Sequence, residues 1–204
     1  MNTQGEQQDF DVIVIGGGPG GAVCAYRLAE RGYSVLLLEK GRFPRYQIGE
    51  SSIPYITGLF DKLGLREIVE QGDFVYKRGI EISDARYTFV GRAHHGRVDY
   101  GLAAAGQRPY AYQFDRARVD TLLLQQAELK GVGVVQDAAV KQVLCTSARL
   151  SGVRYQQAGG QHEAQARWLF AIIWAESKSL HNRLISFFSG CVHCAIQRPG
   201  VASA

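Results

Sequence analysis

The chain has 204 residues, of which 46% are hydrophobic and 21% charged, the composition of an ordinary globular protein with a substantial core. Its formal net charge of +4 is small and scattered, so composition gives no argument for nucleic-acid binding. No apolar run reaches the length of a membrane span, no basic targeting segment precedes residue 10, and the four irregularly spaced cysteines make no disulfide framework. We therefore expect a cytoplasmic protein that binds neither membrane nor nucleic acid.

The first recognisable unit occupies residues 10–39. An apolar run over residues 10–15 predicts a buried strand, residues 19–31 a helix that Gly32 ends, and residues 34–38 a second strand that ends at the acid Glu39. Between the first strand and the helix lies the turn Gly16-Gly17-Gly18-Pro19-Gly20-Gly21. Strand, turn, helix, strand and acid follow in order within about 30 residues, the length of one βαβ unit.

Three glycines of this turn have the G-x-G-x-x-G spacing of a dinucleotide fold. In such a fold Gly16 permits the tight turn, Gly18 lets the backbone approach a pyrophosphate, and Gly21 lets helix and strand pack closely. Glu39 follows Gly21 by 18 residues, where an acid accepts hydrogen bonds from a ribose diol and disfavours a 2′-phosphate. The motif alone does not separate NAD from FAD, and a glycine-rich turn that binds nothing is the alternative.

The rest of the chain alternates between helix and strand signals. We expect a loop over residues 40–54, helices over 56–63 and 65–71, strands over 75–82 and 86–90, mostly loop over 91–106, and a strand over 110–114. Asp115 can cap a helix that runs to Lys130, and strands follow over 132–136, 139–144, 152–156 and 162–169, the last two as a hairpin around Ala158-Gly159-Gly160. The predicted fold class is α/β, with a Rossmann-like βαβ unit and an interleaved mixed sheet.

Three further segments resemble a known family. Phe43-Pro44-Arg45-x-x-Ile48-Gly49-Glu50-Ser51 resembles the second signature of the FADH2-dependent halogenases, which lie within the wider class of FAD-dependent monooxygenases and geranylgeranyl-reductase-like oxidoreductases. Gly72-x-Phe74-x-x-Lys77-x-Gly79 is similar to the segment that holds the halogenases' reactive lysine. Gln113-Phe114-Asp115-Arg116 resembles the family's third conserved helix entry. The resemblance extends over about residues 9–169.

The resemblance implies FAD as cofactor and a set of site residues. Cofactor binding is assigned to Gly16, Gly18, Gly20, Gly21, Glu39, Lys40, Arg45, Gly49, Glu50, Ser51 and Arg116. Lys77 is implied as the catalytic residue, and no metal is implied. From the residues alone, Lys77 can also be read as an exposed lysine at a strand start, and Glu50 as a solvated loop acid.

The implied activity is that of a flavin-dependent halogenase in natural-product biosynthesis. A separate flavin reductase would supply reduced flavin, and O2 with halide would give a hypohalous acid that reaches Lys77. The substrate would be an aromatic small molecule or a carrier-protein-bound ring. Two alternatives stay open, namely a FAD-dependent aromatic hydroxylase that lacks the halogenating lysine, and an inactive truncated flavoprotein fragment.

The resemblance ends near Leu169. We expect residues 1–168 to form a FAD-binding domain with the start of the substrate-side sheet, and residues 169–204 to be a divergent tail, truncated or frame-shifted. The family's Asp- and Gly-containing segments do not appear after Leu169, and neither does the W-x-W-x-I-P segment of the tryptophan halogenases. Cys191-x-x-Cys194 is a single pair, which is too little to predict a metal site.

Overall fold

A computed structural model describes residues 9–83, 88–89, 97–99, 110–146 and 149–172 of the chain. By their contacts these residues divide into two units, one made of residues 1–42 and 124–204 and the other of residues 43–123. No helix among the described residues is long and apolar enough to cross a membrane. The predicted tail, with Cys191 and Cys194, lies outside the described residues except for residues 169–172.

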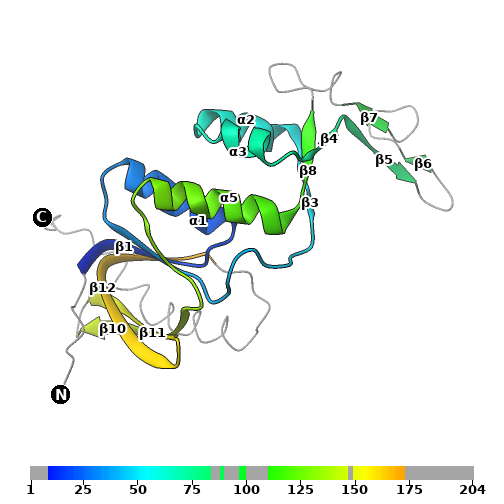
Figure 1. Ribbon diagram of the computed structural model, residues 1–204. Coiled ribbons are helices and arrows are strands. Elements are labelled where there is room, and N and C mark those ends of the chain that lie inside the picture. The colour runs from blue at the N-terminus through cyan, green and yellow to red at the C-terminus, as the bar shows by residue number, and fades with distance from the viewer. Residues whose placement is uncertain (1–8, 84–87, 90–96, 100–109, 147–148, 173–204) are drawn as a thin grey trace, which may run out of the picture. The chain divides into compact units, whose positions relative to one another are not determined.

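The first unit is built on a six-stranded sheet with the order β10-β11-β12-β1-β2-β9 (Figure 1). Its strands are β1 (Asp9–Ile15), β2 (Val35–Leu38), β9 (Gly133–Val135), β10 (Ala139–Thr146), β11 (Arg149–Gln157) and β12 (Gly160–Ala171). β12, β1, β2 and β9 run parallel to one another, whereas β10–β11 and β11–β12 are antiparallel pairs. The predicted Rossmann-like fold with a mixed sheet is therefore confirmed.

Helix α1 (Pro19–Glu30) joins β1 to β2 and packs its small buried residues Ala22 and Ala25 against these strands. It begins with proline in its first turn, where the missing N–H costs no hydrogen bond. Gly32 follows it with φ +84°, a left-handed conformation that glycine adopts without steric cost. The predicted helix is correct to within one residue at its end.

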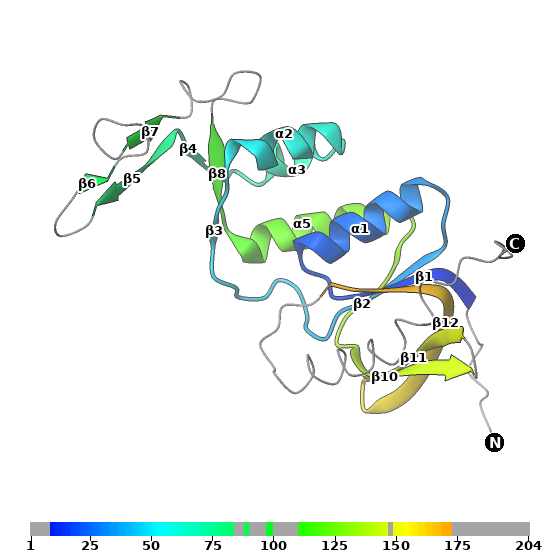
Figure 2. The ribbon, with the colours of Figure 1, turned by 180° about the vertical axis from the view of Figure 1, so that it is seen from behind.

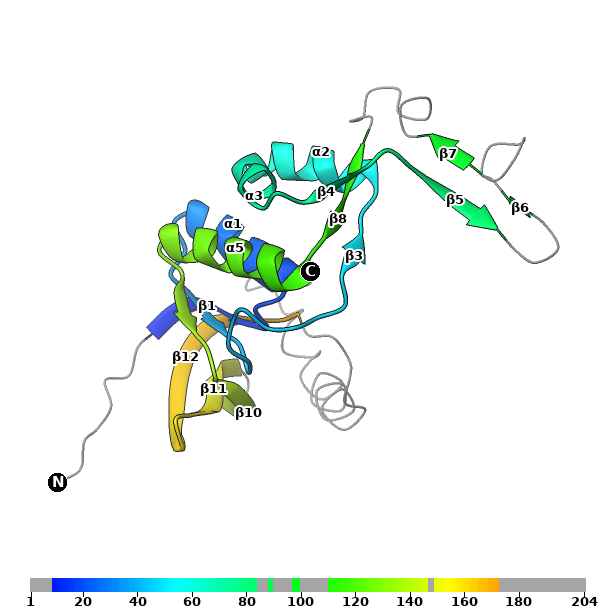
Figure 3. The same cartoon turned by 45° about the vertical axis from the view of Figure 1, so that its right-hand side comes forward.

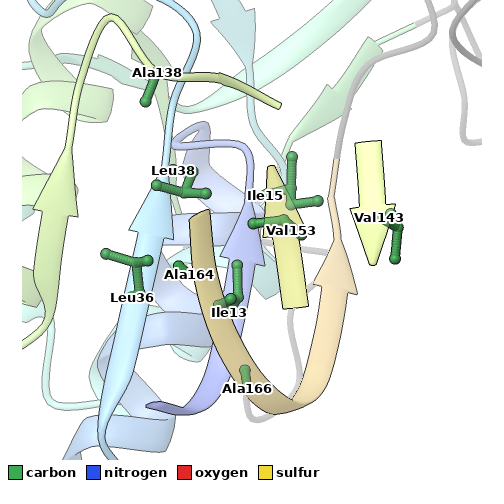
Figure 4. Packing of buried hydrophobic residues seen from close by; sticks show 9 residues of the cluster. All are labelled: Ile13, Ile15, Leu36, Leu38, Ala138, Val143, Val153, Ala164 and Ala166. Carbon is green, nitrogen blue, oxygen red and sulfur yellow. The ribbon is translucent and has the colours of Figure 1, made fainter. Parts of the chain in front are cut away.

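The other face of β1 and β2 carries an apolar core. Figure 4 shows Ile13 and Leu36 of the parallel strands beside Val153 of β11 and Ala164 of β12. β12 curves strongly, so its hairpin with β11 folds back over the sheet (Figure 1). Full burial of each large aliphatic side chain stabilises the fold by about 1.5–3 kcal/mol.

The β11–β12 hairpin confirms its predicted turn. Its two central residues, Ala158 and Gly159, both have positive φ, +49° and +77°. Positive φ at both positions is the mark of the type I′ turn, whose twist matches that of the flanking strands. Both strands extend beyond the predicted bounds, and β12 continues to Ala171 beside β1.

The described residues of the second unit include two complete helices and two small sheets (Figures 2 and 3). Its helices are α2 (Pro54–Lys62) and α3 (Arg66–Gln71). One sheet has the order β3 (Glu50–Ser51), β8 (Ala111–Phe114), β4 (Val75–Lys77), and the other the order β6 (Thr88–Phe89), β5 (Gly79–Ser83), β7 (Arg97–Asp99). Phe114 lies at the centre of an aromatic cluster, with the rings of Phe60 and Phe74 at 5.9 and 5.0 Å between centroids.

Two predictions in this unit are wrong. The single strand expected over residues 75–82 is two strands in separate sheets, because β4 pairs with β8 while β5 pairs with β6 and β7. The loop expected over residues 40–54 contains the short strand β3, which pairs with β8, a partner distant in sequence. The segment expected to be mostly loop over residues 91–106 contains the short strand β7, which pairs with β5. The remaining described strands lie within one to three residues of their expected bounds or extend past them.

Helix α5 (Arg116–Leu129) starts as predicted. The side-chain Oδ1 of Asp115 accepts a hydrogen bond from the backbone N–H of Ala117 at 2.9 Å, which satisfies one of the free N–H groups of the first turn. Val119, Leu123 and Ala127 of the predicted apolar face are buried. Asp120, the residue after Val119, is buried as well. The boundary between the two units falls within this helix.

Candidate functional site

The glycine turn of the first unit is tight and closely packed. Gly16 has φ +106°, and its N–H donates to the carbonyl oxygen of Leu38 at 2.8 Å, which ties the turn to the end of β2. A Cβ added at Gly21 would lie 1.8 Å from the Gly16 oxygen and 3.6 Å from Cγ1 of Val14. Only glycine fits at position 21, so this geometry agrees with the packing role predicted from the sequence.

The turn leads straight into the N-terminus of α1. Gly18 is the N-cap and contributes no capping side chain, Pro19 follows, and the N–H of Ala22 makes a helical bond to the Gly18 oxygen at 2.9 Å. The N–H groups of the preceding residues therefore have no partner within the helix and carry the positive end of its dipole. Pro19 alone adds a side chain to this turn, so an anion can approach the backbone closely.

Glu39 is buried at the end of β2, with 3% of its surface exposed. Its Oε2 accepts the N–H of Gly17 at 2.7 Å and its Oε1 accepts the N–H of Gly41 at 2.8 Å. The carboxylate thus joins the glycine turn to the loop that follows β2. The sequence singles out Glu39 but not these two backbone partners, because no side-chain pattern marks an N–H donor. The next predicted residue, Lys40, is exposed.

In the second unit, Arg116 joins two acids at the start of α5. Its Nε and Nη2 donate to the two carboxylate oxygens of Asp120 at 2.7 and 2.8 Å, and its Nη1 donates to Oε1 of Glu50 at 3.3 Å. Asp120 is fully buried, and its hydrogen bonds raise the pKa of the Arg116 guanidinium against the opposing effect of burial. The spacing of four residues on a helix is the sequence signal for this pair.

Lys77 is buried on β4, with 8% of its surface exposed. Its Nζ donates to Oγ of Ser51 at 2.6 Å and to the carbonyl oxygen of Ser52 at 3.0 Å. Ser52, which sequence reasoning misses, is itself fixed to β8, since its Oγ accepts the N–H of Tyr112 and donates to the Tyr112 oxygen, both at 2.9 Å. The alternative interpretation of Lys77 as an exposed lysine is therefore wrong. Glu50, for which a solvated position is the alternative, is exposed.

The residues before Lys77 explain the spacing of its motif. A Cβ added at Gly72 would lie 1.9 Å from the ring of Phe74, so glycine leaves room for that ring. The Phe74 ring in turn packs edge-on against Phe114 on β8. Asp73 between them has φ +48°, which completes the bend. The glycine and the aromatic residue fix where β4 starts and thereby place Lys77 opposite Ala111.

Two further predicted residues lie in the loop of the second unit. The guanidinium carbon of Arg45 lies 4.9 Å from the ring centroid of Phe43, within the range of a cation–π contact. A Cβ added at Gly49 would lie 3.1 Å from the carbonyl oxygen of Phe114, a close backbone approach. The described residues contain no group of three or more His, Cys, Asp and Glu side chains placed to hold a metal ion.

The structure thus brings the predicted residues together in two separate sets. In the first unit, Glu39 is hydrogen-bonded to the glycine turn. In the second unit, the Glu50–Ser51 strand meets both Arg116 and Lys77. These sets belong to different units. The first contains a helix N-terminus with a buried carboxylate beside it, and the second a buried lysine and a guanidinium paired with a carboxylate.

Comparison with known proteins gives related sequences and folds. Residues 11–95 match the tryptophan halogenase family. The chain is 35% identical over 127 residues to a tryptophan 2-halogenase of Chondromyces crocatus, an alignment that covers 61% of this chain and 22% of the relative. It is 31% identical over 146 residues to a 1H-pyrrole-2-carbonyl-[peptidyl-carrier protein] chlorinase of Pseudomonas fluorescens, covering 66% of this chain and 32% of that protein.

Among solved structures, the myxobacterial chondrochloren halogenase, a FAD-dependent halogenase, superimposes with a TM-score of 0.73 at 36% sequence identity. The superposition covers 84% of this chain and 38% of that one. The chain therefore spans between about a fifth and two fifths of the length of the relatives that it matches.

Proposed function

We propose that this chain is, over its N-terminal part, a flavin-dependent halogenase, and that it acts with FAD to halogenate an aromatic or carrier-protein-bound substrate. The observation that carries the proposal is Lys77, a buried lysine whose ammonium is held by Ser51 and Ser52 within a segment similar to that of the halogenases' reactive lysine. Residues 1–168 would form the FAD-binding domain and residues 169–204 a divergent tail.

The glycine turn fits the pyrophosphate of FAD. It exposes backbone N–H groups at the start of α1, has no room for a Cβ at Gly21, and carries no acid in the first helical turn. We assign the pyrophosphate to Gly16, Gly18, Gly20 and Gly21, the adenosine ribose to Glu39 and Lys40, and the rest of the cofactor to Arg45, Gly49, Glu50, Ser51 and Arg116. When bound and reduced, FAD would supply the activation of O2.

Glu39 would also select against NADP. Its carboxylate is buried beside the turn, and a 2′-phosphate at the ribose position would face it with like charge. At an effective dielectric of about 20, repulsion between such charges a few ångströms apart costs a few kcal/mol. The preference for FAD over NADP follows from this residue.

Lys77 would direct the halogen. A lysine ammonium is a strong hydrogen-bond donor, and its unprotonated amine is a nucleophile that accepts an electrophilic halogen. Held in one position beside a bound aromatic ring, the amine would favour reaction at one carbon. The names of the two sequence relatives include a free amino acid and a carrier-bound pyrrole, so the proposed substrate is an electron-rich ring of either kind. A separate cytoplasmic flavin reductase would deliver the reduced cofactor.

The proposal is tested by supplying the chain with FAD, a flavin reductase, NADH, O2 and chloride. Tryptophan, a phenol and a carrier-bound pyrrole serve as substrates, and mass spectrometry detects chlorinated product. Lys77→Ala and Lys77→Arg should abolish chlorination while hydrogen peroxide release continues, since guanidinium stays protonated and cannot act as the nucleophile. Lys62→Ala, which changes an exposed lysine of α2, is the matched control and should keep full activity. Chlorination by Lys77→Ala at the parental rate would refute the role of Lys77, and hydroxylated products would support the hydroxylase alternative.

A further inference from the structure

The side chain of Lys77 crosses a whole β-strand to reach its partners. Lys77 lies on β4 and Ser51 on β3, and both strands pair with β8, which runs between them. Neighbouring strands lie about 4.8 Å apart, so the lysine spans two strand spacings. The 2.6 Å bond from its Nζ to Ser51 therefore requires an extended side chain lying over β8.

Ala111 is the residue of β8 over which this side chain passes. It pairs directly with Lys77, and directly opposed residues of an antiparallel pair point to the same face of the sheet. Ala111 is completely buried, and its methyl group leaves room above the strand. Gln113, two residues further along the same face, pairs with Ser51. The small side chain at position 111 thus opens the path from Lys77 to β3.

The acceptors at the end of this path are fixed to the sheet. Ser52 makes three hydrogen bonds to the backbone of Tyr112, two through its Oγ and one from its N–H, each at 2.9 Å. Its carbonyl oxygen, which accepts from Lys77 at 3.0 Å, is therefore held in place. Ser51 Oγ stands beside it as the second acceptor. Two acceptors on a fixed backbone give the ammonium one defined position.

We propose that Ser51 is a positioning residue for Lys77, rather than only a cofactor contact. Its hydroxyl fixes the amine of Lys77 at one point over β8, so that the amine presents a transferred halogen at one site. This inference rests on the halogenating role proposed for Lys77. Displacement of a reacting group by about 1 Å can cost a hundredfold in rate, so loss of this contact would change which ring carbon reacts.

Lysine modification of the intact chain tests the position of Lys77 without cofactor or substrate. The chain is treated with formaldehyde and borohydride, and peptide mass spectrometry follows dimethylation of each lysine, with the exposed Lys40, Lys62, Lys130 and Lys141 as internal references. In the parent, Lys77 should react at least about tenfold more slowly than these references. Ser51→Ala should speed modification of Lys77 several-fold and leave the references unchanged.

Ser51→Thr keeps the hydroxyl and should restore slow modification, and Gln113→Ala, on the same face of β8, should not alter it. Modification of Lys77 in Ser51→Ala at the parental rate would overturn the proposal, as would equally fast modification in Ser51→Ala and Ser51→Thr. In the chlorination assay, Ser51→Ala should give a broader mixture of ring isomers than the parent. An unchanged isomer ratio there would also overturn it. Absence of chlorination by the parent would count against the proposed function alone, because the modification rates do not depend on it.

Discussion

Replacement of Glu39 by glutamine should weaken the hydrogen bonds that hold the glycine turn and so destabilise the fold. Each carboxylate oxygen of Glu39 accepts one backbone N–H, from Gly17 at 2.7 Å and from Gly41 at 2.8 Å, in a site that is 3% exposed. Glutamine keeps one acceptor oxygen and places an NH2 group against the other N–H. An unsatisfied buried donor costs about 1–3 kcal/mol, and the loss of charge assistance in the remaining bond adds about 1 kcal/mol. We expect Glu39→Gln to lower the free energy of unfolding by about 2–4 kcal/mol.

The measurement is urea unfolding followed by circular dichroism, with the midpoint and slope compared between variants. Glu128→Gln, at an exposed position of α5, is the matched control and should stay within about 0.5 kcal/mol of the parent. A Glu39→Gln midpoint equal to that of the control would refute the reasoning, because the carboxylate would then not hold the turn.

Three further predictions concern the fold around the two sets of residues. Gly21→Ala should destabilise the folded chain by about 3 kcal/mol or more, since its Cβ would lie 1.8 Å from a backbone oxygen. Its control, Gly58→Ala, has open space in α2 and should stabilise the fold by about 0.5–1 kcal/mol. Thermal melts of the two variants and the parent measure both effects. Asp120→Ala should cost about 3–5 kcal/mol in urea unfolding, because Arg116 would lose its bidentate partner while 17% exposed. Burial raises the pKa of the Tyr112 phenol above its ordinary value of 10.0. Above pH 10 the unfolded chain releases this proton while the folded chain keeps it. Stability should therefore fall as the pH rises above 10, and Tyr112→Phe should lessen the fall.

The βαβ unit and the hairpin could be predicted because their determinants are local. The glycines, the proline of α1 and the acid after β2 lie within one short segment, and Ala158-Gly159-Gly160 marks its turn by residue type alone. The side-chain oxygen of Asp115 caps α5 as its sequence position predicts. In each case the residue types that determine the structure lie close together in the sequence.

The arrangement around Lys77 could not be predicted in the same way. Ser51 is 26 residues from Lys77 in sequence, and β8, which lies between their strands, comes later still in the chain. Residues 75–82 include several strand-favouring types and no proline, so the sequence predicts one strand. The break after Lys77 comes from a change of partner strand, from β8 to β6 and β7, which residue type does not mark. The hydrogen bonds from backbone N–H groups to Glu39 could not be predicted either, because every residue except proline has a backbone N–H and the sequence does not mark which one donates.

The most direct test of the central claim, that the glycine turn binds FAD, is a titration of the chain with FAD followed by quenching of flavin fluorescence. Binding should saturate at one FAD per chain and should be lost in Gly18→Val, whose side chain would occupy the position of the pyrophosphate. NADP in a parallel calorimetric titration should give no binding. Equal affinity of the parent and Gly18→Val for FAD, or tight binding of NADP, would contradict the account.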